Sequence, residues 1–309
     1  MNTEMPQTMK AIQVHTFGGP EVLAYEDVPL PVAGPGEVLI RVFAAGVNPA
    51  DWNTRSGFVN LSEEIRSHLR HFLPLPLILG SDVSGIVEAV GPDVTAFHEG
   101  EAVYGLTRFP PNGGVSATHA EYVTAPVTDL APKPVNLNHL QAAAVPMAAL
   151  TVFQGLEKYG RLEAGQKVLI NGAAGGLGHF AVQLAKTKGA HVIGVASGRH
   201  EAFLRMLGAN EVIDYTTTPL EKVGRIADLV IDTVTGGYDH SLLGVLKRGG
   251  TLLAFGPSYS VEHEASAGVT IQRTQVYSSG ADLARISDLI DAGQVRVTID
   301  TVVPLAEAS

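Results

Sequence analysis

The stretch Lys-Val-Leu-Ile-Asn-Gly-Ala-Ala-Gly-Gly-Leu-Gly-His-Phe-Ala-Val-Gln-Leu-Ala-Lys-Thr-Lys-Gly, residues 167–189, decides the fold of this chain. Its apolar start, residues 168–170, is typical of a strand that is buried on both faces. After a glycine-rich turn, apolar residues repeat with the period of one helix face, at Leu177, Ala181, Leu184 and Ala185. Gly189 predicts the end of this helix. A strand, a glycine turn and a helix in this order aim backbone N–H groups and the positive helix end at one point, where a phosphate can bind.

The glycine pattern of this turn departs from G-x-G-x-x-G. Ala173 occupies the first glycine position, so that the turn reads A-x-G-G-x-G. The pattern by itself also suits a tight turn in an ordinary α/β protein. Its position after a strand and before a helix is, however, the context that a dinucleotide-binding turn requires. The predicted phosphate-binding residues are Gly172, Ala173, Ala174, Gly175, Gly176, Leu177 and Gly178.

Length and charge exclude several classes of protein. With 309 residues the chain is long enough for two domains and a substantial core. Lys and Arg number 21 against 31 Asp and Glu, a net charge of −10, and an acidic chain without a basic run predicts no nucleic-acid partner. No apolar stretch reaches the roughly 18 residues of a membrane span, and none opens the chain as a signal peptide. We therefore expect a cytoplasmic protein without a membrane partner.

The chain contains no cysteine. This excludes disulfides, thiolate nucleophiles and every cysteine-ligated metal site. His68 and His71 lie three residues apart, a spacing that is open to metal ligands. Without cysteine and without a nearby pair of carboxylates, a solvated surface is the better interpretation of these histidines, and we predict no bound metal.

The first part of the chain has the pattern of a β-rich domain. Short extended stretches such as 9–15 and 37–44 are separated by Gly- and Pro-rich turns, which predicts a partly barrelled arrangement of strands. The polar, turn-rich stretch 46–57 follows, in which Asn48-Pro49 can open a turn and a short helix. By itself this stretch also suits a solvated loop. The apolar period of residues 61–72 predicts a further helix.

The pattern changes near residues 132–134 and becomes an alternation of strands and helices. An alanine-rich helical stretch covers 140–156, and the strands expected after residue 170 are 191–196, 211–213, 227–232 and 251–255. This order predicts a parallel, doubly wound sheet with right-handed crossovers. We further expect a helix at 281–291 and a strand at 295–303. The predicted domains are 1–132, completed by about 270–309, and 133–269.

The end of the second strand of this sheet indicates which dinucleotide binds. In such folds an acid at this position hydrogen-bonds the ribose 2′-OH and selects NAD, and it would repel a 2′-phosphate. Here the strand runs into residues 196–199 without an acid. Ser197 can donate a hydrogen bond, Arg199 can pair bidentately with a phosphate, and Tyr215 can stack on adenine or donate to the phosphate. We predict NADP(H), with NADPH preferred over NADH; the alternative is that Arg199 only covers the solvent face of the next helix.

Taken together, several stretches resemble the zinc-independent quinone oxidoreductase branch of the medium-chain dehydrogenase/reductase superfamily, over the whole chain. They are residues 17–23, 46–51, 55–57, 80–85, 151–155 and 171–178. The resemblance implies an α/β protein with a GroES-like catalytic domain, a Rossmann domain with a doubly wound parallel sheet, and a homodimer. Zinc-dependent relatives carry Gly-His-Glu where this chain has Gly80-Ser81-Asp82, and they also use cysteines, so the departures predict neither catalytic nor structural zinc. The family also ends in a Gly-Lys-x-Val-Leu strand, and we expect this tail to be either absent from this sequence or lost, which would weaken an edge of the first domain.

The resemblance also carries individual residues. Asn48 matches the asparagine that lies beside the nicotinamide in the family, Asp51 and Arg55 match polar residues of the same cleft, and Asn53 lies where some relatives carry a tyrosine. On the cofactor side, the matching residues are Thr151, Phe255, Gly256 and Ser258. Thr151 matches a threonine that contacts the cofactor, and the other three match the segment near the nicotinamide carboxamide.

The expected reaction follows from the missing metal. Without a Lewis acid, alcohol oxidation loses its usual means of stabilising an alkoxide, whereas a conjugated acceptor needs only a donor for the oxygen on which charge develops. We predict an NADPH-dependent oxidoreductase that transfers hydride to a small-molecule quinone or α,β-unsaturated carbonyl compound, with Asn48 as the candidate donor. The general acid does not follow from the sequence. The alternatives are an enoyl-thioester reductase, which a basic rim for the phosphate of CoA would favour, and a non-catalytic NADPH-binding protein.

Overall fold

The computed structural model describes residues 6–71, 73–109, 116–234, 240–255 and 268–308. The chain forms two compact units. The first consists of Met1–Met147, Tyr277–Asp288 and Val297–Ser309, and the second of Ala148–Val276 and Leu289–Arg296. Residues 133–147, which we expected in the second domain, therefore pack with the first unit. No helix in the described ranges is long and apolar enough to cross a membrane.

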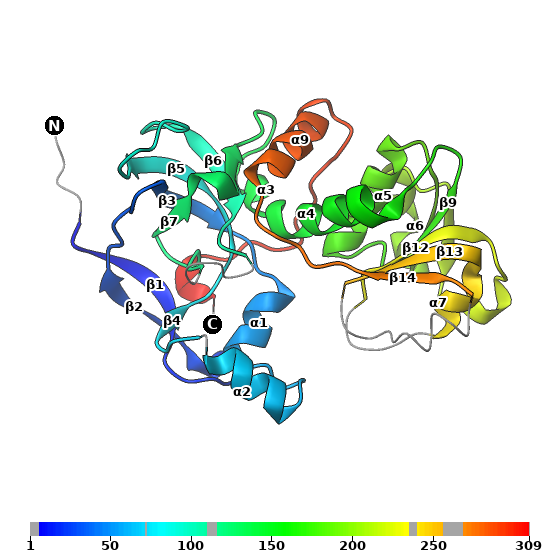
Figure 1. Cartoon of the computed structure of the whole chain (residues 1–309), viewed down its shortest axis with the longest axis horizontal. Helices are drawn as coiled ribbons and strands as arrows, with labels where there is room; N and C mark the ends of the chain where they lie inside the picture. The colour runs from blue at the N-terminus through cyan, green and yellow to red at the C-terminus, as the bar shows by residue number, and fades with distance from the viewer. Residues whose placement is uncertain (1–5, 72, 110–115, 235–239, 256–267, 309) are drawn as a thin grey trace. The chain divides into compact units, whose positions relative to one another are not determined.

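The first unit is built from two antiparallel sheets (Figure 1). The smaller has the order β2-β1-β4, formed by β1 (Thr8–Val14), β2 (Leu23–Pro29) and β4 (Leu77–Ile78). The larger has the order β7-β3-β5-β6-β8, formed by β3 (Glu37–Ala45), β5 (Asp82–Val90), β6 (Ala102–Leu106), β7 (Tyr122–Pro126) and β8 (Leu130–Pro132). Alternate residues of β3 and β5 enter one apolar cluster, which includes Val38, Ile40, Val83 and Val87. The predicted β-rich, GroES-like domain is confirmed.

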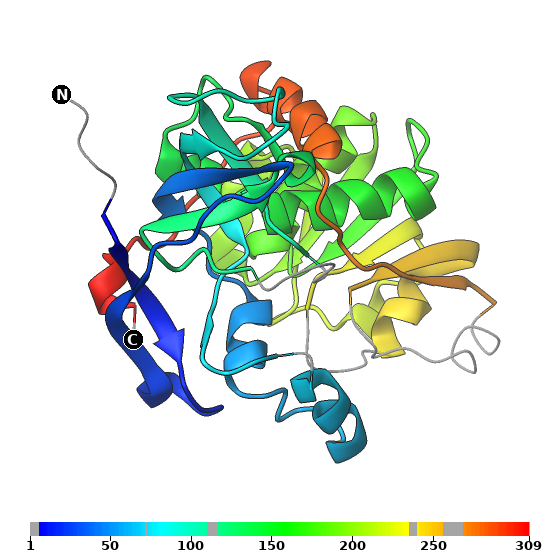
Figure 2. The same ribbon diagram turned by 60° about the vertical axis from the view of Figure 1, so that its left-hand side comes forward.

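Short helices and turns complete the first unit. They are 3₁₀ turns at Pro20–Val22 and Val127–Asp129, and the helices α1 (Pro49–Arg55), α2 (Glu63–His71), α3 (His139–Ala143) and α9 (Gly280–Asp291). α2 lies where the sequence predicted a helix, but it buries no residue, and Ile65 keeps 49% of its surface exposed. A last 3₁₀ turn, Leu305–Glu307, lies beside β1 of the β1–β2 hairpin (Figure 2).

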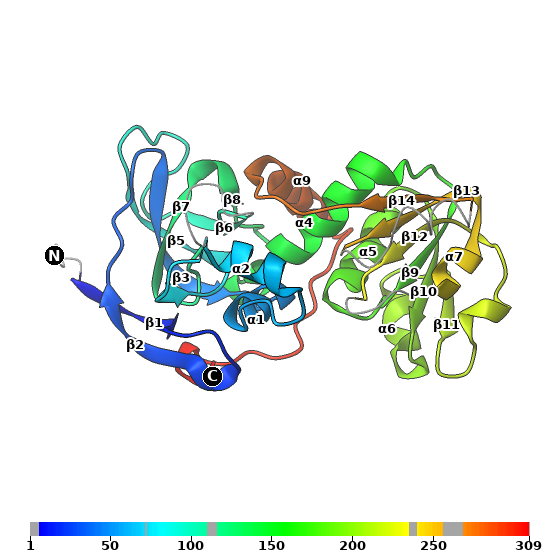
Figure 3. The same ribbon diagram turned by 60° about the horizontal axis from the view of Figure 1, so that its bottom comes forward.

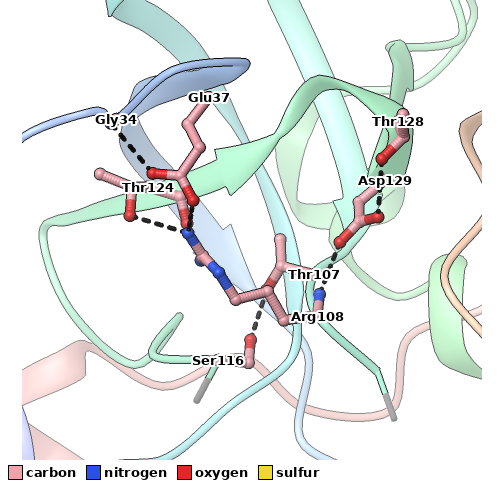
Figure 4. Close-up of polar contacts among 8 residues, drawn as sticks. All are labelled: Gly34, Glu37, Thr107, Arg108, Ser116, Thr124, Thr128 and Asp129. Carbon is pink, nitrogen blue, oxygen red and sulfur yellow. Dashed lines mark hydrogen bonds and ion pairs between the residues drawn. The ribbon is translucent and has the colours of Figure 1, made fainter. Parts of the chain in front are cut away.

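Arg108 joins strands of the larger sheet (Figure 4). It follows β6 with φ +49°, and its backbone N–H donates to Asp129 Oδ2 at 2.6 Å. The guanidinium donates to the backbone carbonyl of Thr124 on β7 and to Glu37 Oε1 on β3, the latter at 2.5 Å. The Arg108 side chain is only 9% exposed, so this ion pair is shielded from water more than a surface pair would be. Arg108 is thus held against the larger sheet by both its backbone and its side chain.

The second unit contains a six-stranded, all-parallel sheet (Figures 1 and 3). Its order is β11-β10-β9-β12-β13-β14. The strands are β9 (Lys167–Asn171), β10 (His191–Ala196), β11 (Glu211–Asp214), β12 (Ala227–Asp232), β13 (Leu246–Ala254) and β14 (Thr270–Arg273). Numbered along the chain, this is the 3-2-1-4-5-6 order of dinucleotide-binding sheets, which place their ligand at the carboxyl ends of the strands where the order reverses. The predicted Rossmann domain is confirmed.

Helices and turns connect these strands. They are α4 (Pro146–Gly155), a π-helical turn at Leu156–Gly160, α5 (Gly176–Thr187), a 3₁₀ turn at Gly198–His200, α6 (Glu201–Met206), a 3₁₀ turn at Leu220–Lys222 and α7 (His240–Val245). The single helix expected over 140–156 is divided into α3 and α4, because Pro146 has no N–H to continue a helix. α5 packs on β9 and β10 and buries Phe180, Ala181, Leu184 and Ala185.

The prediction of a strand over 295–303 is wrong. These residues belong to no strand. The backbone N–H of Arg296 donates to Gln183 Oε1 at 2.7 Å, and the Gln183 amide donates back to the Arg296 carbonyl at 3.0 Å. Val295 is buried beside this contact. A glutamine side chain therefore satisfies the backbone groups that would otherwise need a neighbouring strand.

The turn between β9 and α5 depends on a very close backbone approach. Gly172 has φ +72°, and a Cβ atom built on Gly178 would lie 2.1 Å from the carbonyl oxygen of Gly172. By contrast, a Cβ atom on Gly176 would meet nothing within 4 Å. Of these two glycines of α5, Gly178 is therefore required for the packing of the helix against the turn, and Gly176 is not.

We expect Gly178→Ala to lower the free energy of unfolding by about 3 kcal/mol or more, because backbone must move to accept the methyl group. Gly176→Ala is the matched control, and its effect should stay within about 1 kcal/mol. Urea denaturation of the two variants measures both values. Equal losses of stability would show that the close approach does not matter.

Candidate cofactor site and active site

The turn after β9 accepts Ala173 in place of a glycine. Ala173 is fully buried, and its backbone N–H donates to the carbonyl of Val195 on β10 at 3.0 Å. Its methyl group points at Gly194, where an added Cβ would lie 3.2 Å from it. A dinucleotide-binding turn needs a small residue at this position. Ala173 is small enough here because the neighbouring strand has a glycine, Gly194, opposite its methyl group.

The amino end of α5 is open. Gly175 is its N-cap and has no side chain to bond the first turn, and Gly175 and Gly176 are both exposed. The first N–H groups of a helix have no partner within it, and the helix dipole adds positive charge there. The bare backbone and the space beside Gly176 fit an anionic group such as the pyrophosphate of a dinucleotide.

The first turn of α5 also contains His179, a buried polar residue that no sequence motif indicates. Its Nδ1 lies 3.1 Å from the Gly175 carbonyl, so Nδ1 carries the proton. The other ring nitrogen, Nε2, is buried and has no hydrogen-bond partner among the described residues. Burial lowers the pKa of His179, which keeps the ring neutral. In the sequence His179 is an ordinary position of the helix, so only the structure shows that its ring is buried with a nitrogen that lacks a partner in the described part of the chain.

The carboxyl ends of β10 and β11 hold the residues predicted to read the adenosine ribose. Ser197 is half-buried, whereas Arg199 and Tyr215 are exposed. The structure adds an acid here: Asp214 at the end of β11 aligns with Ala196, and a Cβ on Gly198 would lie 2.5 Å from Asp214 Oδ2. The second strand carries no acid at its end, but Asp214 of the third strand brings a carboxylate to the same place.

The Asp214 carboxylate is held by several N–H and O–H donors. Its Oδ1 accepts from the Thr216 N–H at 2.9 Å and from Thr216 Oγ1 at 2.7 Å. These bonds, with a further one from the Gly198 N–H, lower the pKa of Asp214. The acid is thus ionised and braces the turn that carries Arg199.

Thr151 and Phe255 lie at the same face of α4 in the second unit. Thr151 is buried in α4, and Gly155 lies one turn later on the same helix face. A Cβ on Gly155 would lie 3.4 Å from Cε1 of Phe255. Phe255 therefore packs on the face of α4 that also carries Thr151. Gly256 and Ser258 lie outside the described residues.

In the first unit, α1 holds Asn48 at its amino end. Asn48 is the N-cap and is buried, and Asp51 reaches back so that its Oδ2 accepts from the Asn48 N–H at 2.7 Å. The other oxygen of Asp51 accepts from the Gly80 N–H at 3.1 Å. Burial raises the pKa of Asp51, and nearby His119 opposes this rise. Both carboxylate oxygens of Asp51 thus accept hydrogen bonds from backbone N–H groups.

Asp82 at the start of β5 holds the side chain of Asn48. The Asn48 Nδ2 donates to Asp82 Oδ2 at 2.9 Å, and the Met147 N–H donates to Asp82 Oδ1 at 2.8 Å. Asp82 is 2% exposed. Burial raises its pKa to about 7, and the neighbouring Asp51 charge adds to the rise, while the two hydrogen bonds oppose it.

His119 belongs to the same cluster. Its Nε2 donates to the carbonyl of Gly46 at 3.1 Å, and its backbone N–H donates to Leu79 at 3.0 Å. Next to it, Thr118 Oγ1 is buried and has no hydrogen-bond partner among the described residues. A Cβ on Gly80 would lie 2.4 Å from this oxygen, so Gly80 keeps the space open.

The other two predicted catalytic residues lie further along α1. Asn53 and Arg55 are both half-buried. Arg55 Nε donates to the Gly18 carbonyl at 3.4 Å, a long bond that ties the end of the helix to the turn after β1. The structure thus groups Asn48 and Asp51 with Asp82 and His119, and it leaves Asn53 and Arg55 outside these hydrogen bonds.

A cavity of about 430 Å³ lies elsewhere in the first unit. Its walls come mainly from β1, β2 and β7, and they include Met9, Gln13, Val28, Ile78, Tyr122 and Arg108. None of the predicted site residues lines this cavity, and the guanidinium of Arg108 is already paired with Glu37. We therefore do not assign the chemistry to it.

Known proteins resemble the chain over nearly its whole length. Residues 34–135 match the family model of an alcohol dehydrogenase GroES-like domain, and residues 207–309 match that of a zinc-binding dehydrogenase. The chain is 33% identical over 336 residues to the mitochondrial NAD(P)H oxidoreductase RTN4IP1 of Mus musculus, covering 97% of this chain and 84% of the relative. It is also 33% identical over 308 residues to the 2-methylene-furan-3-one reductase of Solanum lycopersicum, covering 96% and 72%.

A solved structure agrees with these relatives. The quinone oxidoreductase from Coxiella burnetii superposes with a TM-score of 0.85 at 35% identity, covering 97% of this chain and 93% of that one. Both units of the present chain are therefore represented in a protein of known structure.

Zinc, which one of the matching family models names, does not fit the residues of this chain. Cysteine is absent from the sequence. Within the ranges that the structure describes, no group of three His, Asp or Glu side chains could hold a metal ion. Asp82, at the position of the glutamate of zinc-dependent relatives, uses both oxygens to accept N–H groups.

Asp82 should make the stability of the protein fall as the pH rises. Its pKa is raised from 3.8 to about 7, so between these values the folded state keeps a proton that the unfolded state has lost. The free energy of unfolding should decrease by about 4 kcal/mol across this window and level off above it. In Asp82→Asn this part of the pH dependence should vanish. Denaturation of both proteins from pH 4 to 8 measures the difference, and a difference that is constant with pH would contradict the expectation.

Proposed function

Because this chain belongs to the quinone oxidoreductase-like branch of the medium-chain dehydrogenase/reductase superfamily, we propose that it uses NADPH to reduce a quinone or another α,β-unsaturated carbonyl compound. The observation that carries this proposal is the open amino end of α5, placed after β9 in a sheet of 3-2-1-4-5-6 order. The names of the relatives support it, since they include an NAD(P)H oxidoreductase, a 2-methylene-furan-3-one reductase and a quinone oxidoreductase.

The second unit would hold the cofactor. We assign the pyrophosphate to the N–H groups of Gly176 and Leu177, and the nicotinamide end to Thr151 and Phe255. When bound, the nicotinamide supplies a hydride. The chain itself supplies binding energy and orientation, and the buried, neutral ring of His179 supports the first turn of α5 without adding a charge.

The preference for NADPH rests on Arg199. Its Nε donates to His200 at 3.0 Å, which leaves the terminal NH₂ groups of an exposed guanidinium available for a 2′-phosphate. Asp214 opposes this preference with a negative charge in the same corner. Its oxygens are, however, directed at the donors of Thr216 and Gly198, which reduces the repulsion.

The first unit would supply the donor for the substrate. We propose that the carboxamide of Asn48 donates a hydrogen bond to the oxygen on which charge develops, or positions the nicotinamide. Asp51 is the less suitable donor, because both its oxygens already accept backbone N–H groups. We assign the final proton to solvent. We expect a homodimer, as the resemblance to the family implies. A cytoplasmic location also stays a prediction.

Arg199→Ala should lower kcat/KM for NADPH by roughly ten- to a hundred-fold and change that for NADH less than about three-fold, since only NADPH has the 2′-phosphate. Arg205→Ala is the matched control, because Arg205 pairs with Glu201 on the exposed side of α6. Steady-state kinetics with both cofactors measure the ratio. A loss of equal size for the two cofactors would contradict the assignment of Arg199.

A panel of quinones, enones, enals and enoyl-CoA thioesters, followed by NADPH consumption at 340 nm, tests the substrate class. We expect turnover of the quinones or of the enones and enals, because the acidic chain offers no basic rim for the phosphates of CoA. Preference for enoyl-CoA would instead favour the thioester reductase. NADPH binding without turnover of any acceptor would favour a non-catalytic protein.

A further inference from the structure

We propose that Asp82 is a positioning residue, whose buried carboxylate holds the carboxamide of Asn48 in one orientation for the reaction. This role rests on the proposed function, in which Asn48 contacts the substrate or the nicotinamide. The residues that carry it come from the start of β5, the amino end of α1 and the first turn of α4.

The hydrogen bonds of Asp82 determine which end of the Asn48 amide faces it. Asp82 Oδ1 is occupied by the Met147 N–H at 2.8 Å, and Oδ2 receives Asn48 Nδ2 at 2.9 Å. An ionised carboxylate can only accept, so it must face the NH₂ group and not the oxygen of the amide. The oxygen of the Asn48 amide then faces the backbone N–H of Asp51 in the capping box of α1, and the remaining amide N–H is left for another partner.

The surroundings leave little freedom for either side chain. Asn48 is 9% and Asp82 2% exposed. A Cβ on Gly46 would lie 2.7 Å from Asp82 Oδ2 and 2.8 Å from the Ala143 carbonyl, so only glycine at position 46 leaves room for the carboxylate. Asp51 holds the backbone of Asn48 independently, through its bond to the Asn48 N–H.

The charge of Asp82 should therefore influence Asn48. The ionisable groups in the cluster are Asp51, Asp82 and His119. Asp82 gains a proton at lower pH and can then donate from Oδ2, which allows the amide of Asn48 to turn its oxygen toward Asp82. Since the pKa of Asp82 is about 7, both forms are populated near neutral pH.

A double-mutant cycle tests whether Asp82 acts through Asn48. Asn48→Ala, Asp82→Ala and the double variant are compared in kcat and in KM for NADPH and acceptor. Asp82→Ala should lower kcat roughly ten- to a hundred-fold with KM for NADPH changed less than about three-fold, because the donor is misplaced. In the Asn48→Ala background the same substitution should change kcat less than about three-fold. Equal losses in both backgrounds would overturn the proposal.

Asp129→Ala is the matched control. Asp129 is another buried carboxylate of the first unit whose pKa is raised by burial, and it accepts from the Arg108 N–H at 2.6 Å, away from Asn48. Loss of a buried carboxylate should lower the stability of this variant, while its kcat at 25 °C stays that of the wild type. If Asp82→Ala behaves in the same way, its role is structural and the proposal fails.

The side-chain amide of Asn48 gives a readout that needs no turnover. Its ¹H–¹⁵N resonances, identified by their absence in Asn48→Ala, should shift with pH around a midpoint near 7 in the wild type and in Asp129→Ala, but not in Asp82→Asn. Resonances that do not respond to pH in the wild type would overturn the proposal. If no acceptor is turned over, the proposed function fails, and this measurement still decides whether Asp82 controls Asn48.

Discussion

The close approach of α5 to the end of β9 is the constraint on which the second unit depends. The Gly178 backbone lies so near the Gly172 carbonyl that a methyl group would come within 2.1 Å of the oxygen. This contact brings the first turn of the helix over the strand end and leaves its N–H groups uncovered at the edge where the strand order reverses. The same packing forces a small residue at position 173, and Gly194 on the next strand accommodates its methyl group.

In the first unit the corresponding constraint is the burial of a polar side-chain amide, that of Asn48. Asn48 is held there by two acids from two elements, Asp51 for its backbone and Asp82 for its side chain. Burying two carboxylates together is costly, and the raised pKa of each records that cost. Their donors are backbone N–H groups and the amide itself, so orientation here is obtained without a metal ligand set.

Local signals predicted most of the fold, and the failures have a common cause. The strands and helices of the second unit follow from apolar runs, periods and glycine stops, which act over a few residues. The β-branched stretch 295–303 belongs to no strand, and the backbone of Arg296 within it bonds to the side chain of Gln183, more than a hundred residues away. Likewise, the amphipathic period of α2 predicted a helix correctly but did not show that the helix would leave Ile65 exposed.

For the site, the sequence by itself showed the absence of cysteine ligands and predicted a phosphate at the glycine turn, because these depend on residue type and short spacing, whereas the role expected of Asn48 came from the resemblance to the family. Asn48 and Asp51 are neighbours at the start of α1, but only the tertiary structure brought Asp82 and His119 to them, although more than thirty residues separate Asn48 from Asp82. It also placed Asp214 beside Gly198, because parallel strands align their carboxyl ends and so bring a residue of β11 to the end of β10. Such contacts are decided by strand register and by the packing of separate elements, and no local pattern of residues encodes them.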